Sequence, residues 1–142
     1  MILLDTNVVS ELMRAKPLRD PNVSAFLNGQ PLDSFFLPSI VVAELRYGIL
    51  RLPAGRKRAG LQAVLEQLLA EGFTNRILVF DGACATKYAE ARSARERTGR
   101  PVAMADALIG GMALAYGARL ATRNIGDFEG YGLSLMNPWD AQ

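Results

Sequence analysis

Short apolar runs alternate with longer helical stretches along this chain, and no tight hairpin signal joins any two of the runs. Runs of this kind are typical of strands that are covered on both faces. They lie at residues 2–4, 35–37, 77–80, 133–136 and from 120 onward. Strands separated by helices form βαβ units. We therefore expect an α/β fold with three α/β/α layers and a mainly parallel sheet of roughly five strands.

The size and composition of the chain limit its class. The 142 residues suffice for one domain with a buried core and are too few for two ordinary domains, so we expect a single domain over residues 1–142. No apolar stretch reaches the roughly 20 residues of a membrane helix, and Asp5 interrupts the start before a signal-peptide core can form. We expect a soluble protein of the cytoplasm.

The first predicted strand ends on a carboxylate. Asp5 follows the apolar run Ile2–Leu4 directly, so it lies at the carboxyl end of the strand, where open parallel sheets place their ligands. Thr6 and Asn7 are residue types that cap helices, and we expect them to cap the helix that runs to Met13. The result is an anionic point fixed at one edge of the sheet.

The chain contains no histidine and only one cysteine, Cys84. Histidine is the commonest metal ligand and the base of most nucleophilic triads, so these mechanisms are excluded. A single cysteine also rules out an intrachain disulfide and a cysteine-based zinc site. Carboxylates remain as the main chemical groups, and they are the ligands that Mg²⁺ and Mn²⁺ prefer. Any metal site in this chain is therefore expected to be built from oxygen.

Two further carboxylates occur within predicted helices. Glu44 belongs to a helix over residues 40–50, capped by Ser39, and its neighbours three and four residues away are apolar or small, which places it on an apolar face. Asp106 is the only charged residue of the helix predicted for residues 102–117, with Pro101 near its first position. An acid in an apolar helix is costly to bury without a cation, although an arginine could supply one in place of a metal.

Two other aspartates follow predicted strands but differ in their expected role. Asp127 lies just past the fourth strand and completes a set of four acids at one sheet edge. Asp81 precedes Gly82 and a helix over residues 83–97, so we assign it to capping that helix. Four like charges repel one another and become stable together when divalent cations lie among them.

Basic residues dominate the rest of the chain. If four of the 14 acids form one site, ten acids face 16 basic residues elsewhere, of which 13 are arginine. This excess suits a phosphate-bearing partner and equally an ordinary solvated surface. The loop holding Arg14, Lys16 and Arg19 has the same two interpretations. The helix over residues 83–97 carries several charges, Arg95 among them, and much of this set is expected to form a solvated face.

These segments resemble the PIN domains, and more narrowly the VapC and FitB group of bacterial toxin ribonucleases. The resemblance covers nearly the whole chain. It rests on Leu4-Asp5-Thr6-Asn7-Val8-Val9-Ser10-Glu11-Leu12, Ala43-Glu44-Leu45-Arg46-Tyr47-Gly48, Ala105-Asp106-Ala107-Leu108-Ile109, Ala121-Thr122-Arg123-Asn124-Ile125-Gly126-Asp127-Phe128 and Asn137-Pro138-Trp139.

The resemblance implies a site and a reaction. In that family the four acids hold Mg²⁺ or Mn²⁺, which carries over to Asp5, Glu44, Asp106 and Asp127. Accessory polar positions match Thr6, Asn7, Thr122 and Asn124, and the last of these is implied to contact metal-bound water. The implied activity is endoribonuclease cleavage of single-stranded regions of RNA, with tRNA among the candidates.

The resemblance also implies partners. Such toxins are homodimers that a cognate VapB- or FitA-like antitoxin inhibits by inserting a segment into the acidic groove, and the complex often binds operator DNA. Two alternatives stay open. A non-catalytic RNA- or protein-binding module with the same fold is expected to lack one of the acids, yet all four are present. A phosphatase of the haloacid-dehalogenase type needs a second aspartate two residues after the first, where this chain has Asn7.

Overall fold

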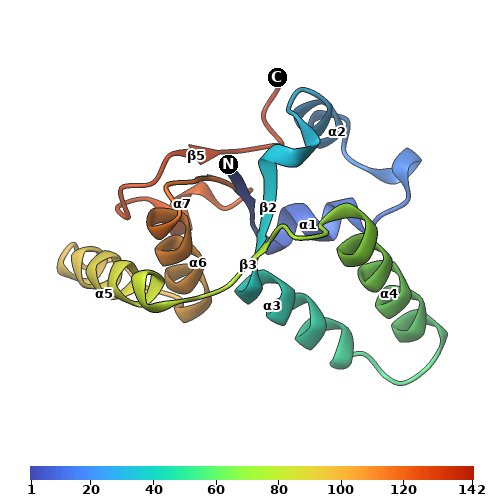
Figure 1. Cartoon of the computed structure of the whole chain (residues 1–142), viewed down its shortest axis with the longest axis horizontal. Helices are drawn as coiled ribbons and strands as arrows, with labels where there is room; N and C mark the ends of the chain where they lie inside the picture. Colours follow the sequence, from blue (N-terminus) through green and yellow to red (C-terminus); the bar gives the residue numbers. More distant parts are fainter.

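The computed structural model describes residues 1–142, and its five strands form one sheet in the order β3-β2-β1-β4-β5 (Figure 1). All four neighbouring pairs are parallel, which confirms the predicted sheet. The strands are β1 (Ile2–Leu4), β2 (Phe35–Pro38), β3 (Ile77–Leu78), β4 (Arg119–Ala121) and β5 (Leu135–Met136). The edge strands β3 and β5 are two residues shorter than predicted. Val79, expected in β3, is 62% exposed and has no strand beside it.

The central strand is apolar because helices cover both of its faces. Ile2, Leu3 and Leu4 are completely buried. Figure 1 shows α5, α6 and α7 on one side of the sheet and α1, α2, α3 and α4 on the other, which confirms the three-layer α/β/α architecture. No helix combines the length and the apolar content that a membrane span requires.

Seven α-helices connect the strands. They are α1 (Thr6–Leu12), α2 (Pro21–Asn28), α3 (Ser39–Leu50), α4 (Arg56–Gln67), α5 (Gly82–Arg97), α6 (Met104–Ala115) and α7 (Ile125–Phe128). Short helical segments lie at η1 (Lys16–Leu18), η2 (Leu32–Ser34) and η3 (Leu68–Gly72), the last of which is a π-helical turn where a continuous helix to Gly72 was expected.

Three predicted helix starts are wrong and one is confirmed. Asp5, rather than Thr6 or Asn7, caps α1, because its carboxylate accepts the Thr6 N–H at 2.8 Å. Pro38 is the cap residue of α3, and no side chain satisfies the first N–H groups there. Asp81 caps α5 as predicted, by accepting the Cys84 N–H at 3.0 Å.

The third wrong start concerns α6, which begins at Met104 instead of next to Pro101. Residues 101–103 lie outside the helix, so Asp106 falls in the first turn of α6. Close packing fixes α6 against α5, because a Cβ atom at Gly111 would lie only 2.8 Å from the backbone of Tyr88. The position of Asp106 is thereby tied to the position of α5.

Candidate active site

The sheet order creates a crevice next to the central strand. The chain runs from β1 outward through β2 to β3 and then returns to β4 on the other side of β1. In open parallel sheets, ligands bind at such a switch point, outside the carboxyl ends of the strands. Leu4 pairs with Ala121, so Asp5 and Thr122 leave neighbouring strands side by side.

Asp5 is held at this point by neutral hydrogen-bond donors. It is only 5% exposed. Its Oδ1 accepts the Thr6 N–H, and its Oδ2 accepts the Thr122 hydroxyl at 2.7 Å and the Asn7 amide at 3.2 Å. Burial raises the pKa of Asp5, the three hydrogen bonds lower it, and the charge of Asp127 raises it. The donors therefore fix the direction of the carboxylate without adding a positive charge.

Three of the four accessory residues take part in this arrangement. Thr122 is completely buried, and its Oγ1 accepts the Asn124 backbone N–H at 3.0 Å. The Asn7 side chain accepts the Arg123 N–H at 3.2 Å and so joins the start of α1 to the end of β4. Thr6 contacts another acid, described next. The Asn124 side chain is exposed and makes no capping bond to α7, so its predicted role stays a prediction.

Glu44 reaches the same place from α3. The Thr6 hydroxyl donates to Glu44 Oε1 at 2.8 Å, which connects the second acid to the residue that follows Asp5. The predicted apolar face was wrong in part: the buried stripe of α3 is Val41, Leu45 and Ile49, while Glu44 is half-buried beside it. It is one of the residues that line a cavity of about 340 Å³. That cavity is formed by Thr6, Ser10, Met13, Glu44, Leu45, Gly48, Ile49, Leu52 and Leu61.

Asp106 is half-buried in the first turn of α6, and no ion pair involves it. Burial, followed by repulsion from three other carboxylates, raises its pKa to about 6. Those carboxylates are Asp5, Asp127 and Glu44, in order of decreasing effect. The structure thus brings the other three predicted acids within electrostatic reach of Asp106.

Asp127 occupies a different setting from the one expected. It does not follow a strand directly but lies in the short helix α7, and it is exposed. Its negative charge nevertheless raises the pKa of both Asp5 and Asp106. Asp127 is therefore the outermost of the four carboxylates.

The four acids carry like charges, and none of them has a basic partner in an ion pair. The five ion pairs of the protein all use other acids, namely Glu11, Glu66, Glu90, Glu96 and Glu129. As the side chains stand, no three acidic or thiol groups form a set that could hold a metal ion. The donor chemistry fits a hard cation, because every group is a carboxylate and none forms an ion pair with an arginine.

Sequence reasoning missed Arg95, which is buried and not on a solvated face. It is 5% exposed. Its positive charge lowers the pKa of Asp106 and so offsets part of the increase that burial and the three other carboxylates cause. A signal was present in the sequence: Cys84, Tyr88, Ala91 and Arg95 are spaced four, three and four residues apart, which places them on one helix face. That face packs against α6.

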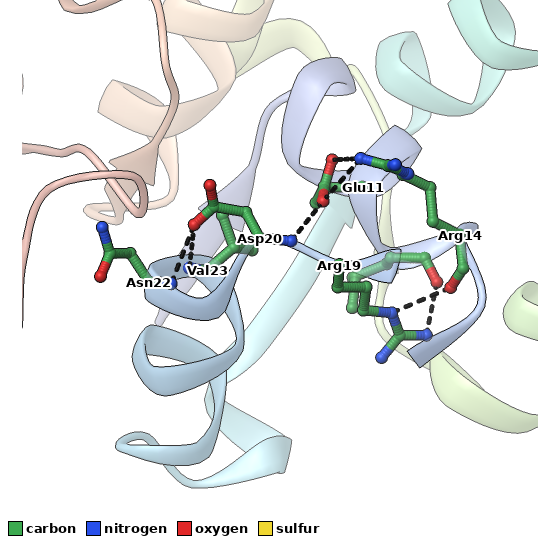
Figure 2. A network of polar contacts seen from close by, with 7 residues as sticks. Glu11, Arg14, Arg19, Asp20, Asn22 and Val23 are labelled. Carbon is green, nitrogen blue, oxygen red and sulfur yellow. Dashed lines mark hydrogen bonds and ion pairs between the residues drawn. The ribbon is translucent and has the colours of Figure 1, made fainter. Parts of the chain in front are cut away.

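A second buried acid, Glu11, belongs to a separate network at the far end of α1 (Figure 2). Its carboxylate accepts hydrogen bonds from the Asp20 N–H at 2.7 Å and from the Arg14 guanidinium at 3.3 Å. Arg19 donates to the carbonyls of Leu12 and Arg14. Two of the three basic residues of this loop are thus committed to its own structure.

The comparisons with known proteins agree with this geometry. A sequence model described as "PIN domain" matches residues 2–131. The chain belongs to the PIN-domain family. It is 44% identical to the plasmid stability protein StbB of Pseudomonas syringae over 141 residues, which cover 99% of this chain and all of that one. It is 39% identical to the VapC ribonuclease Y4jK of Sinorhizobium fredii over 140 residues, 99% of each chain.

A third relative and a solved structure align with this chain in the same way. The toxin FitB of Neisseria gonorrhoeae is 40% identical over 139 residues, 98% of this chain and 99% of that one. A structure of FitAB bound to a DNA fragment superimposes with a TM-score of 0.89 at 38% identity, covering 100% of this chain and 98% of the other. This PIN domain thus aligns with such relatives over almost its full length.

Proposed function

We propose that this PIN-domain protein is a divalent-metal-dependent endoribonuclease and the toxin of a type II toxin–antitoxin system. The observation that carries the proposal is the group of four carboxylates at the switch point, which repel one another and have no basic partner. Relatives aligned over almost the whole chain bear the names VapC ribonuclease and toxin FitB, which supports the reaction class and the biological role.

Asp5, Glu44 and Asp106 are the residues that would hold Mg²⁺ or Mn²⁺, with Asp127 completing the set from the exposed side. A bound ion of this kind supplies an activated water and neutralises charge on a phosphodiester under attack. The protein's own part is to aim the ligands: Thr122 and Asn7 fix Asp5, and the Thr6 hydroxyl fixes Glu44. Such supporting hydrogen bonds typically matter 10- to 100-fold for metal affinity.

The RNA backbone has a suitable cation at the rim of the site. Arg123 is exposed between Thr122 and Asn124, stacks on the Trp139 ring at 5.1 Å and forms no ion pair. A guanidinium held on an aromatic face can bind phosphate with two donors. We assign the Arg123 guanidinium to binding a phosphate of the RNA next to the cleaved bond. Single-stranded RNA, including exposed loops of tRNA, has the flexibility to reach a recessed carboxylate group.

The proposed toxin role requires an antitoxin. The related structures are complexes named FitAB and VapBC, several of them with DNA, and we extend a VapB- or FitA-like partner and a toxin homodimer to this chain. The cavity beside Glu44 is lined by apolar residues that include Leu45, Ile49 and Leu61, and Glu44 is the one acid in its lining. A partner segment with apolar side chains and one arginine matches both features.

An RNA cleavage assay tests the proposal. Purified protein is incubated with tRNA and unstructured RNA in Mg²⁺ or Mn²⁺, in EDTA, and as the Asp106→Asn variant. We expect metal-dependent cleavage that both EDTA and the substitution abolish. Cleavage that persists in EDTA or in the variant would contradict the mechanism. RNA binding without cleavage in any metal would indicate the non-catalytic module instead.

A further inference from the structure

Arg95 is a buried cation whose hydrogen bonds all go to main-chain carbonyls of distant segments. Its Nε donates to the Pro101 carbonyl at 3.2 Å, one terminal nitrogen donates to Gly126 at 3.1 Å, and the other donates to Glu129. The guanidinium is a planar fork, so three acceptors around it must keep a defined mutual geometry. One side chain of α5 therefore fixes three points of the chain relative to one another.

These three points flank two of the predicted ligands. Pro101 lies in the segment that leads into the first turn of α6, where Asp106 is located. Gly126 and Glu129 stand on either side of Asp127, at α7. Arg95 thus joins the segment that carries Asp106 to the segment that carries Asp127. The exposed ion pair of Arg100 with Glu129 also joins the two segments, but Arg95 is the buried side chain that donates hydrogen bonds to both.

The Arg95 guanidinium stacks on the ring of Tyr131 in a cation–π contact. The Arg95 guanidinium carbon lies 5.1 Å from the ring centroid, and the ring in turn packs edge-on against Phe128 at 6.2 Å. The Tyr131 hydroxyl is the one buried side-chain polar atom without a hydrogen-bond partner. The aromatic face of Tyr131, and not its hydroxyl, is the part that holds Arg95 in place.

Charge alone does not explain a cation at this position. No carboxylate pairs with Arg95, and a buried cation without an ionic partner is costly. A positive charge close to a divalent-ion site also repels that ion. Electrostatics therefore predicts tighter metal binding when Arg95 is neutralised, whereas loss of the carbonyl fork predicts weaker binding. The two explanations differ in sign.

We propose that Arg95 is a positioning residue that holds the Asp127 segment against the Asp106 segment, so that the two carboxylates can share one divalent ion. This inference rests on the proposed function, because it presupposes a metal at the four acids. Arg95 touches neither metal nor RNA in this scheme. Its effect passes through the carbonyls of Pro101, Gly126 and Glu129.

The test measures Mn²⁺ affinity without RNA, by titration calorimetry near neutral pH, for the wild-type protein, Arg95→Gln and Arg95→Lys. Lysine retains the charge and the aliphatic stem but loses the planar fork. We expect both variants to bind Mn²⁺ about 10- to 100-fold more weakly, as is typical when support around ligands is lost. Unchanged affinity in Arg95→Lys, or tighter binding in Arg95→Gln, would overturn the proposal.

Two matched controls separate positioning from general damage. Arg92→Gln removes an arginine of the same helix that contacts Glu96 and Tyr88, and we expect it to leave Mn²⁺ affinity unchanged. Tyr131→Phe removes only the unpartnered hydroxyl and should also leave Mn²⁺ affinity unchanged. Circular dichroism in EDTA establishes that each variant is folded, and if Arg95→Gln is not, Arg95→Lys decides alone. A wild-type protein that binds no Mn²⁺ refutes the proposed function itself.

Discussion

A buried acid lies at each end of α1, and the two acids differ in the charge of their hydrogen-bond partners. Glu11, 9% exposed at the end of the helix, is matched by the Arg14 guanidinium and the Asp20 N–H (Figure 2). Asp5, 5% exposed at the start, is surrounded by neutral donors and faces other carboxylates. Glu11 is neutralised by a neighbouring arginine and therefore stabilises the folded chain. Asp5 is oriented by neutral donors only, so its carboxylate remains free to bind a cationic ligand.

This difference extends to the cost of each acid. Hydrogen bonds to a charged group stabilise a protein by about 1.5–3 kcal/mol, so Glu11 contributes to folding by closing the loop before α2. Asp5 faces the repulsion of Asp127 and raises the pKa of Asp106 as well. The active-site end of α1 is therefore strained electrostatically in the metal-free protein, and its other end is satisfied. Mutations at the two ends should separate activity from stability.

The largest expected effect is the loss of activity in Asp5→Asn. The amide keeps the size of the side chain but removes the charge that would bind the metal. Metal-based stabilisation of a transition state is worth several kcal/mol, and about 4 kcal/mol corresponds to a 10³-fold lower rate of RNA cleavage. Single-turnover cleavage measures this rate. Thermal unfolding in EDTA should show a folded variant, because relief of the repulsion offsets part of the cost of the hydrogen bonds that an amide nitrogen cannot accept.

The second effect in size is a loss of stability in Glu11→Gln. The amide oxygen can keep the two bonds that Oε1 accepts from Asp20 and Arg14, but the contact of Arg14 with Oε2 is lost and the remaining bonds lose their charge. We therefore expect about 1–2 kcal/mol lower stability in urea unfolding. The folded variant should cleave RNA at the wild-type rate, because Glu11 lies outside the acidic site. Glu90→Gln is the matched control, since it breaks an exposed pair with Lys87. We expect it to change stability by less than about 0.5 kcal/mol. Equal losses in both variants would show that Glu11 is no better satisfied than a surface acid.

The sequence was informative where a single residue carries the signal. The run before Asp5 predicts a central buried strand, and the lone acid of α6 predicts a carboxylate at the site, because an apolar setting makes one charge conspicuous. The relation between Asp5 and Thr122 could not be obtained in this way. It depends on β1 pairing with β4, a contact that joins residues more than a hundred positions apart.

Arg95 and the start of α6 escaped prediction for a shared physical reason. Arg95 sits among alternating charges that are typical of a solvated face, and its partners are carbonyls, which every residue possesses. Pro101 favours a helix start, yet its carbonyl is held by Arg95 and the helix begins at Met104. A hydrogen bond to a main-chain carbonyl does not require any particular residue type at the acceptor position. Such contacts therefore cannot be predicted from the sequence and are seen only in the folded protein.

The smallest expected effect concerns pH and the unpaired carboxylate Asp106. An aspartate of the unfolded chain titrates near 3.8, whereas in the folded protein the pKa of Asp106 is about 6. Between these values the folded state holds a proton that the unfolded state has released, so lowering the pH through 6 favours folding. Above pH 6 the ionised side chain destabilises the metal-free protein. Because Asp106 is half-exposed, solvent screening reduces this cost to about 1 kcal/mol.

The measurement is the difference in urea stability between Asp106→Asn and the wild-type protein, both in EDTA. The variant should be more stable at neutral pH, and the gap should close as the pH falls from 6 toward 4, because the wild-type carboxyl then becomes neutral as well. Mn²⁺ should reverse the order by stabilising only the protein that binds it. A gap that stays constant with pH would mean that folding does not disfavour the ionised form of Asp106, and the contrast between the two kinds of acid would fail.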